Sequence, residues 1–177
     1  IPMHVVAEVE RPSRAGTFGQ SPFALAQGVT FEKSLFARDA ERIRTELARA
    51  GVIPSPEATF VDFRLLMNGG RKIKNLTDAS TPTDELLPSV AHGGVHLPLV
   101  VAGACLRLPG EPVLLPEAAL ALDALVVREA DGEVELVVGE VKTSPDRAGF
   151  TDRAQLATAR AQAGTYAHAL DETLTRL

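Results

Sequence analysis

The sequence predicts a single domain of the α/β class, with helices at both ends of a region of apolar strands. Residues 96–143 contain apolar runs separated by turn signals, which is typical of strands. Apolar residues recur with helical spacing at positions 31, 35, 36, 43 and 47, and the chain beyond about residue 151 is alanine-rich and free of proline. The 177 residues suffice for one domain with a substantial core.

The N-terminal region is expected to hold one strand and two helices. Residues 1–20 contain the apolar run HVVAEVE, typical of a strand, followed by a polar loop. Ser21-Pro22 then supplies an N-cap with proline at the first helical position. Gly28 is expected to divide the following segment into a short and a longer helix, and Gly51 is a candidate C-cap.

The middle of the chain is rich in turn-forming residues. Residues 54–94 predict a long irregular connection with one short element, FVDFRLL, and a basic tip at GGRKIKN (69–75). Residues 96–108 then predict a buried strand. Two further strands, 118–127 and 133–143, flank Asp131-Gly132, a strong hairpin signal. We expect residues 1–177 to form one domain, which is also a candidate fragment because the chain opens on Ile1 rather than Met.

Composition excludes several classes of protein. The net charge of -5 argues against a protein that coats nucleic acid by charge alone, although an acidic site filled by metal remains compatible with it. One cysteine, Cys105, excludes a disulfide framework, and no iron–sulfur cluster is expected from this chain alone. The longest apolar stretch, 97–106, is too short to span a bilayer, so we expect a cytoplasmic protein without a membrane partner.

The predicted hairpin places two acids opposite one another. If Asp131-Gly132 is a two-residue loop, Ala130 pairs with Glu133, and counting back along both strands puts Asp123 opposite Glu140. Strand alternation puts Lys142 on the same face as Glu140. The pattern therefore gathers two carboxylates and an amine at one point.

Two carboxylates at that separation repel each other, and a divalent cation would remove the repulsion. Lys142 would then be placed to orient or deprotonate a water, or to stabilise charge on a phosphate. The alternative is a structural salt bridge, in which Lys142 offsets Asp123 and Glu140 near a sheet edge.

These residues resemble the motif of the PD-(D/E)XK nuclease superfamily: an acid on one strand, here Asp123, followed by Glu140-Val141-Lys142 on the next. Its RecB-like branch adds Q-x-x-x-Y on a later helix, which QAGTY matches from Gln162 to Tyr166. It also carries an acid on an early helix, and GVTFEKSLF supplies Glu32. Gln155 lies seven residues before Gln162 and shares its helix face.

The resemblance implies a restriction-endonuclease-like fold: a central mixed β-sheet flanked by helices, with the active site on a β-hairpin. It implies Mg²⁺- or Mn²⁺-dependent hydrolysis of phosphodiester bonds, with Asp123, Glu140 and Lys142 as catalytic residues. The metal ligands would be Glu32, Asp123, Glu140 and the main-chain carbonyl of Val141. Gln155, Gln162 and Tyr166 are the candidate nucleic-acid contacts.

DNA is the expected partner, and a helicase, a CRISPR protein or another defence or repair protein is a candidate protein partner. Two alternatives stay open: a catalytically inactive module that binds nucleic acid or protein, and a nuclease that acts on RNA. His92 and His96 are interpreted as loop residues rather than a zinc pair, and Cys105 as an inert core residue. The basic residues with candidate phosphate contacts are Arg71, Lys72, Lys74, Arg147, Arg153 and Arg160, and the equal alternative for the first three is a solvated turn.

Overall fold

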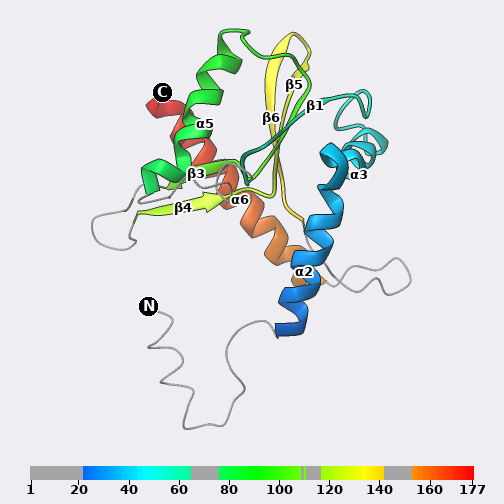
Figure 1. Ribbon diagram of the computed structural model, residues 1–177. Helices are drawn as coiled ribbons and strands as arrows, with labels where there is room; N and C mark the ends of the chain where they lie inside the picture. The colour runs from blue at the N-terminus through cyan, green and yellow to red at the C-terminus, as the bar shows by residue number, and fades with distance from the viewer. Residues whose placement is uncertain (1–21, 65–75, 109, 111–116, 142–152) are drawn as a thin grey trace.

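A mixed β-sheet with helices on both faces forms the centre of the protein (Figure 1). The computed structural model describes residues 22–64, 76–108, 110, 117–141 and 153–177. Within them, four strands lie in the order β1 (Thr59–Asp62), β2 (Leu99–Ala102), β5 (Ala124–Ala130) and β6 (Glu133–Gly139). The β1–β2 pair is parallel, whereas β2–β5 and β5–β6 are antiparallel. The predicted α/β class with a mixed, helix-flanked sheet is therefore confirmed.

Strand alternation divides the core between the two faces of the sheet. One face packs against α5 (Leu76–Ala91) and α6 (Arg153–Arg176), and the other against the helix pair α2 (Pro22–Leu35) and α3 (Ala37–Arg49). The strand residues on the α5–α6 face include Leu99, Val101, Leu125 and Val127. Those on the α2–α3 face are Val100, Ala102, Ala124 and Val126. Because both faces are covered, β2 and the first half of β5 are apolar throughout.

The N-terminal helices begin and end close to the predicted residues, but they divide elsewhere. α2 begins at Pro22, and α3 is followed by Gly51 with a left-handed φ of 72°. The predicted division at Gly28 is wrong, since α2 runs through it and the chain turns after Leu35 instead. Leu35 and Phe36 lie at this turn and are both buried in the core.

The prediction of a long irregular connection over residues 54–94 is wrong for its second half, which contains α5. This helix includes Pro82 and Pro88, whose missing N–H groups led the sequence-based interpretation away from a helix. The Ala79, Thr83, Leu87 and Val90 side chains recur with helical spacing and are all buried. Tertiary packing of this stripe stabilises the helix despite its prolines. The short element predicted at FVDFRLL is confirmed in part by β1.

The two long strands predicted at 96–108 and 118–127 are each divided in two. The first separates into β2 and β3 (Cys105–Leu108) at Gly103, whose φ is 70°. The second separates into β4 (Ala118–Ala121) and β5 around Leu122 and Asp123. β3 and β4 pair with each other in a small second sheet. Both chain segments therefore pass from one sheet to the other at neighbouring positions. As a result, Asp123 lies at a strand end rather than within a strand.

The predicted C-terminal helix is confirmed by α6, while other predictions fall outside the described residues. These are the strand and loop within 1–20, Ser21, the basic tip at 69–75, Lys142 and Arg147. None of the described helices is long and apolar enough to cross a membrane.

Candidate active site

The hairpin register that brings the two acids together is confirmed by the structure. β5 pairs with β6 from Ala130↔Glu133 to Ala124↔Gly139. Asp131 and Gly132 both have positive φ, 54° and 80°, as a two-residue turn of type I′ requires. Asp123 immediately precedes β5 and Glu140 immediately follows β6, next to the Ala124↔Gly139 pair. The two acids therefore occupy opposing positions at the end of the hairpin.

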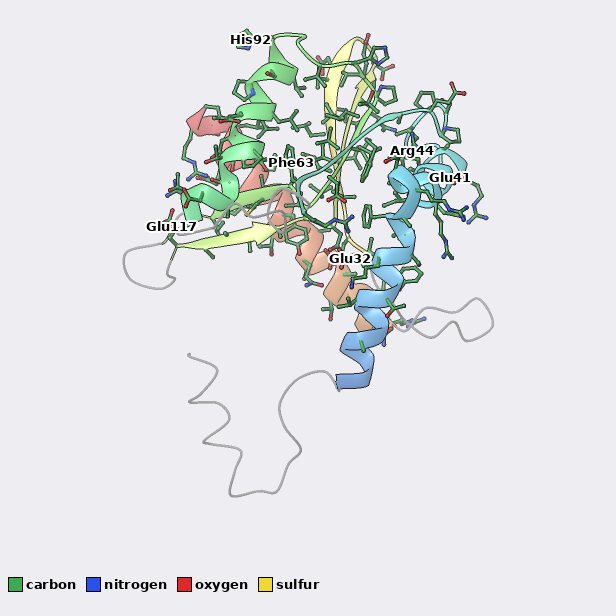
Figure 2. The ribbon with its side chains drawn as sticks, in the orientation of Figure 1. Glu32, Glu41, Arg44, Phe63, His92 and Glu117 are labelled. Carbon is green, nitrogen blue, oxygen red and sulfur yellow. The ribbon has the colours of Figure 1, made fainter. Side chains whose placement is uncertain are left out.

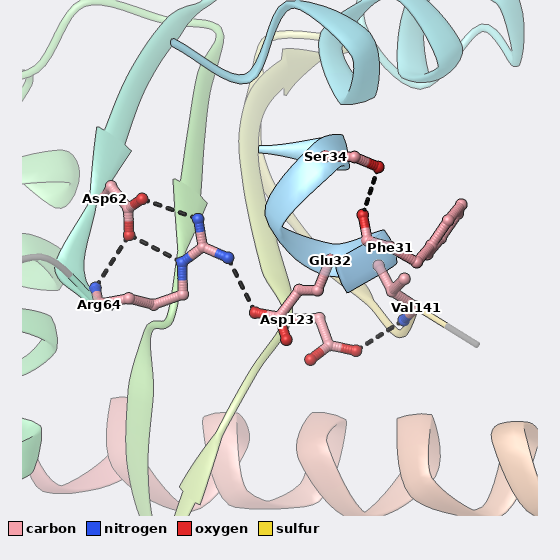
Figure 3. A network of polar contacts seen from close by, with 7 residues as sticks. All are labelled: Phe31, Glu32, Ser34, Asp62, Arg64, Asp123 and Val141. Atoms are coloured by element: carbon pink, nitrogen blue, oxygen red, sulfur yellow. Dashed lines mark hydrogen bonds and ion pairs between the residues drawn. The ribbon is translucent and has the colours of Figure 1, made fainter. Parts of the chain in front are cut away.

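A side-chain hydrogen bond joins these two strand ends. The Oδ2 atom of Asp123 accepts a hydrogen bond of 2.7 Å from the backbone N–H of Val141 (Figure 3). This bond continues the contact between the strands after the ladder has stopped at Gly139. It also holds the Val141 main chain beside the Asp123 carboxylate.

Tyr166 on α6 lies within electrostatic reach of both acids. Burial of its ring raises the pKa of Tyr166 to about 12, together with the negative charges of Glu140 and Asp123 and a hydrogen bond to Glu140. Tyr166 also packs against the core on the α5–α6 face of the sheet. The structure thus brings together Asp123, Glu140, Val141 and Tyr166, which the sequence placed on three separate motifs.

The two glutamines of α6 differ in their surroundings. Gln162, one turn before Tyr166, has a buried Oε1 atom that accepts no hydrogen bond from the described residues. Gln155, two turns earlier on the same helix, has an exposed side chain. Of the predicted nucleic-acid contacts, Gln162 and Tyr166 are therefore half-buried beside the sheet, whereas Gln155 is exposed.

Glu32 approaches the site from the other helical layer and is already paired. Its Oε1 atom accepts a hydrogen bond of 2.8 Å from Nη1 of Arg64, which also binds Asp62 (Figure 3). In Figure 3 the Glu32 and Asp123 carboxylates point toward the same space. Helix α2 borders that end of the hairpin, since Phe31 packs in one cluster with Val141.

Sequence reasoning missed Asp62 and Arg64. The available signal was the Asp-Phe-Arg sequence directly after a short strand, because such strand ends commonly carry functional side chains.

The donor atoms suit a hard divalent cation, since the acids and the Val141 carbonyl supply only oxygen ligands. Among the described residues, however, no three Asp, Glu, His or Cys side chains lie close enough together to hold a metal ion. The Oε1 atom of Glu32 is engaged by Arg64, and Glu32 does not form a three-carboxylate group with Asp123 and Glu140. The oxygen donors are therefore chemically suited to Mg²⁺, but three ligating side chains are not gathered around one point among the described residues.

The other candidate residues lie away from this site or are structural. His92 and His96 are exposed in the connection after α5, as predicted, and Figure 2 shows His92 far from Glu32. Cys105 is buried in β3, where burial and the charge of Asp84 raise the pKa of its thiol, as expected for an inert core residue. Arg153 and Arg160 are exposed on α6.

No protein-family description, no curated protein and no solved structure gives a significant match to this chain. The function must therefore be inferred from the residues of the site and their geometry.

Proposed function

We propose that this protein is a divalent-metal-dependent deoxyribonuclease with a restriction-endonuclease-like fold, of the RecB-like branch of the PD-(D/E)XK superfamily. The observation that carries the proposal is the hairpin register, which sets Asp123 opposite Glu140 at the end of an otherwise apolar pair of strands. The hydrogen bond between Asp123 and Val141 supports the proposal, because it keeps the Val141 main chain next to the acids. Two carboxylates and a main-chain carbonyl are the ligand types that the motif requires.

In the proposed reaction, Asp123, Glu140 and the Val141 carbonyl would hold Mg²⁺ or Mn²⁺, and Glu32 would complete the set. The cation would neutralise the carboxylates and stabilise the charge that develops on the phosphate. Lys142 orients the attacking water and takes part in removing its proton. Water adds to phosphorus, the bond from phosphorus to the leaving oxygen breaks, and that oxygen takes up a proton.

Substrate binding is assigned to α6. The buried Oε1 atom of Gln162, one turn before Tyr166, accepts no hydrogen bond from the described residues, so an ordered water would satisfy it, as would a nucleotide donor once the side chain turns outward. Tyr166 offers a hydroxyl group and a ring face for stacking on a base. Arg153 and Arg160 on the exposed side of the same helix are suited to phosphate contacts.

One observation favours a second candidate, a non-catalytic module that binds nucleic acid or protein. Glu32 is held by Arg64 rather than being gathered with Asp123 and Glu140, and no three-residue ligand group is present among the described side chains. In a protein that does not bind metal, an acid at the position of Glu32 would be expected to form a stable ion pair instead of binding a cation.

The two candidates differ in the requirement for metal and for the site residues. Linear and closed-circular DNA, and RNA of the same sequence, are incubated with Mg²⁺ or Mn²⁺ and wild-type protein, Lys142→Ala or Glu140→Gln. Glu129→Gln is the matched control, because it removes an exposed carboxylate from the same hairpin. We expect DNA cleavage by the wild type and by the control, and a loss of at least about 100-fold in both site variants.

The outcomes separate the candidates. Absence of cleavage with every divalent metal, or equal cleavage by Lys142→Ala, would refute the nuclease assignment. Preferential cleavage of RNA would keep the chemistry and change the substrate. Calorimetry with Mn²⁺ tests the metal independently: binding should be lost in Asp123→Asn and kept in Asp171→Asn, an exposed aspartate on α6.

A further inference from the structure

Carboxylates from distant parts of the chain meet at one end of the central sheet. Asp62 lies in the same row of paired residues as Gly139, so it ends β1 at the level where β6 ends. The adjoining acids are Glu32, Asp123 and Glu140. Like charges at this density raise the free energy of the folded chain unless cations accompany them. Arg64 is a cation that the structure pairs with two of them, Asp62 and Glu32.

Arg64 makes more hydrogen bonds to Asp62 than to Glu32. Asp62 accepts three hydrogen bonds from Arg64: from the backbone N–H at 3.0 Å, from Nε at 2.9 Å and from Nη2 at 2.7 Å. Glu32 accepts one, from Nη1 at 2.8 Å. The Asp62 side chain is 11% exposed and the Glu32 side chain 39% exposed. Because the Asp62 side is multidentate and better shielded from water, the contact with Glu32 is the one that breaks more readily.

The position of the guanidinium is set by two further residues. Its central carbon lies 4.0 Å from the centre of the Phe36 ring, a cation–π contact that stabilises the guanidinium at this position. The stem of Arg64 crosses Gly103, where a Cβ atom would lie only 2.4 Å from Cγ of the arginine. Arg64 is thus directed across the end of β2 toward α2, with Nη1 presented to Glu32.

We propose that Arg64 is a positioning residue that competes with the divalent cation for the Glu32 carboxylate. Without metal, Arg64 holds Glu32 and compensates part of the acidic charge. When metal binds, Glu32 leaves Nη1 for the cation, while Asp62 and Phe36 keep the guanidinium in place. This inference rests on the proposed metal-dependent function, and it explains why three ligands are not gathered although the residues for them are present.

The test is a double-mutant cycle read by Mn²⁺ calorimetry rather than by cleavage. Arg64→Gln should tighten Mn²⁺ binding by about three- to tenfold, because Glu32 no longer has to break an ion pair. In the Glu32→Gln background the same substitution should change the affinity by less than about twofold. The matched control is Arg42→Gln, which removes an arginine lying 5.7 Å above the Phe31 ring on the neighbouring helix. It should leave the effect of Glu32→Gln unchanged.

Each outcome decides between the inference and the function on which it rests. Equal tightening by Arg64→Gln with and without Glu32 would indicate general repulsion and overturn the competition. An unchanged affinity in Arg64→Gln, with binding still dependent on Asp123, would also overturn it and leave the metal site intact. Binding that is absent in every variant would refute the proposed metal-dependent function itself. If Arg64→Gln does not fold, Arg64→Met replaces it in the same cycle, because methionine keeps an apolar stem and removes the charge. The same dependence on Glu32 is expected, and equal tightening in both backgrounds again overturns the competition.

Discussion

Replacing Gly103 by alanine should destabilise the protein more than the same change at another glycine with the same backbone conformation. Gly103 has φ 70°, a left-handed angle that costs a non-glycine residue about 1–2 kcal/mol. The added Cβ would also lie 2.4 Å from Cγ of Arg64 and 3.1 Å from its backbone nitrogen. Moving those atoms costs a further 1–3 kcal/mol or so, the usual range for overpacking. The expected loss in the free energy of unfolding is therefore about 2–5 kcal/mol.

Gly132→Ala is the matched control for this prediction. Gly132 has φ 80°, and a Cβ placed there meets no atom within 4 Å, so only the backbone cost of about 1–2 kcal/mol remains. Urea unfolding of both variants, followed by circular dichroism, measures the difference between them. In an Arg64→Ala background the extra cost at Gly103 should shrink, since the nearest atom has been removed. Equal destabilisation at both glycines would refute the reasoning that Gly103 is required for the passage of Arg64.

Two further predictions use residues that occur once in the chain. Tyr166 is the only tyrosine and there is no tryptophan, so tyrosinate absorbance should titrate near pH 12 in the folded protein and near pH 10 in the unfolded chain. Because the pKa of Tyr166 is raised in the folded protein, the protonated tyrosine contributes to the free energy of unfolding below pH 10, and this contribution is lost as the pH rises through 12. Glu140→Gln should lower the pKa of Tyr166 in the folded protein, and an unchanged pKa would contradict the contact between Tyr166 and Glu140. Cys105 is 3% exposed and burial raises the pKa of its thiol, so a thiol reagent should react with it only at the rate of unfolding, and rapid labelling of the native protein would show that β3 is accessible.

The candidate site was predictable from the sequence wherever it depends on local geometry. Asp131-Gly132 sets the turn type, the turn type sets the register, and the register puts Asp123 opposite Glu140 without knowledge of the rest of the fold. The position of Tyr166 followed only in part, since helical spacing relates it to Gln162 but not to the strands.

Other features depended on contacts between segments that are distant in the chain. The strand breaks at Gly103 and Leu122 arise because both segments turn together into the second sheet, held by hydrogen bonds from Gly103 N to Leu122 O and from Leu122 N to Ala104 O. Helix α5 forms around two prolines because its buried stripe packs on the sheet. Each segment alone also fits the pattern that was predicted, so packing between distant segments decided the outcome.

The sequence by itself determined the α/β class, the hairpin, its two opposing acids and the C-terminal helix, because turn chemistry and side-chain periodicity act over a few residues. Only the tertiary structure decided that Arg64 binds Glu32, a residue 32 positions earlier in the chain. The same holds for Tyr166, whose pKa is raised by burial and by the charges of Glu140 and Asp123 at the end of the hairpin. Electrostatic contacts of this kind depend on distances that packing sets, and no local pattern of residues records them.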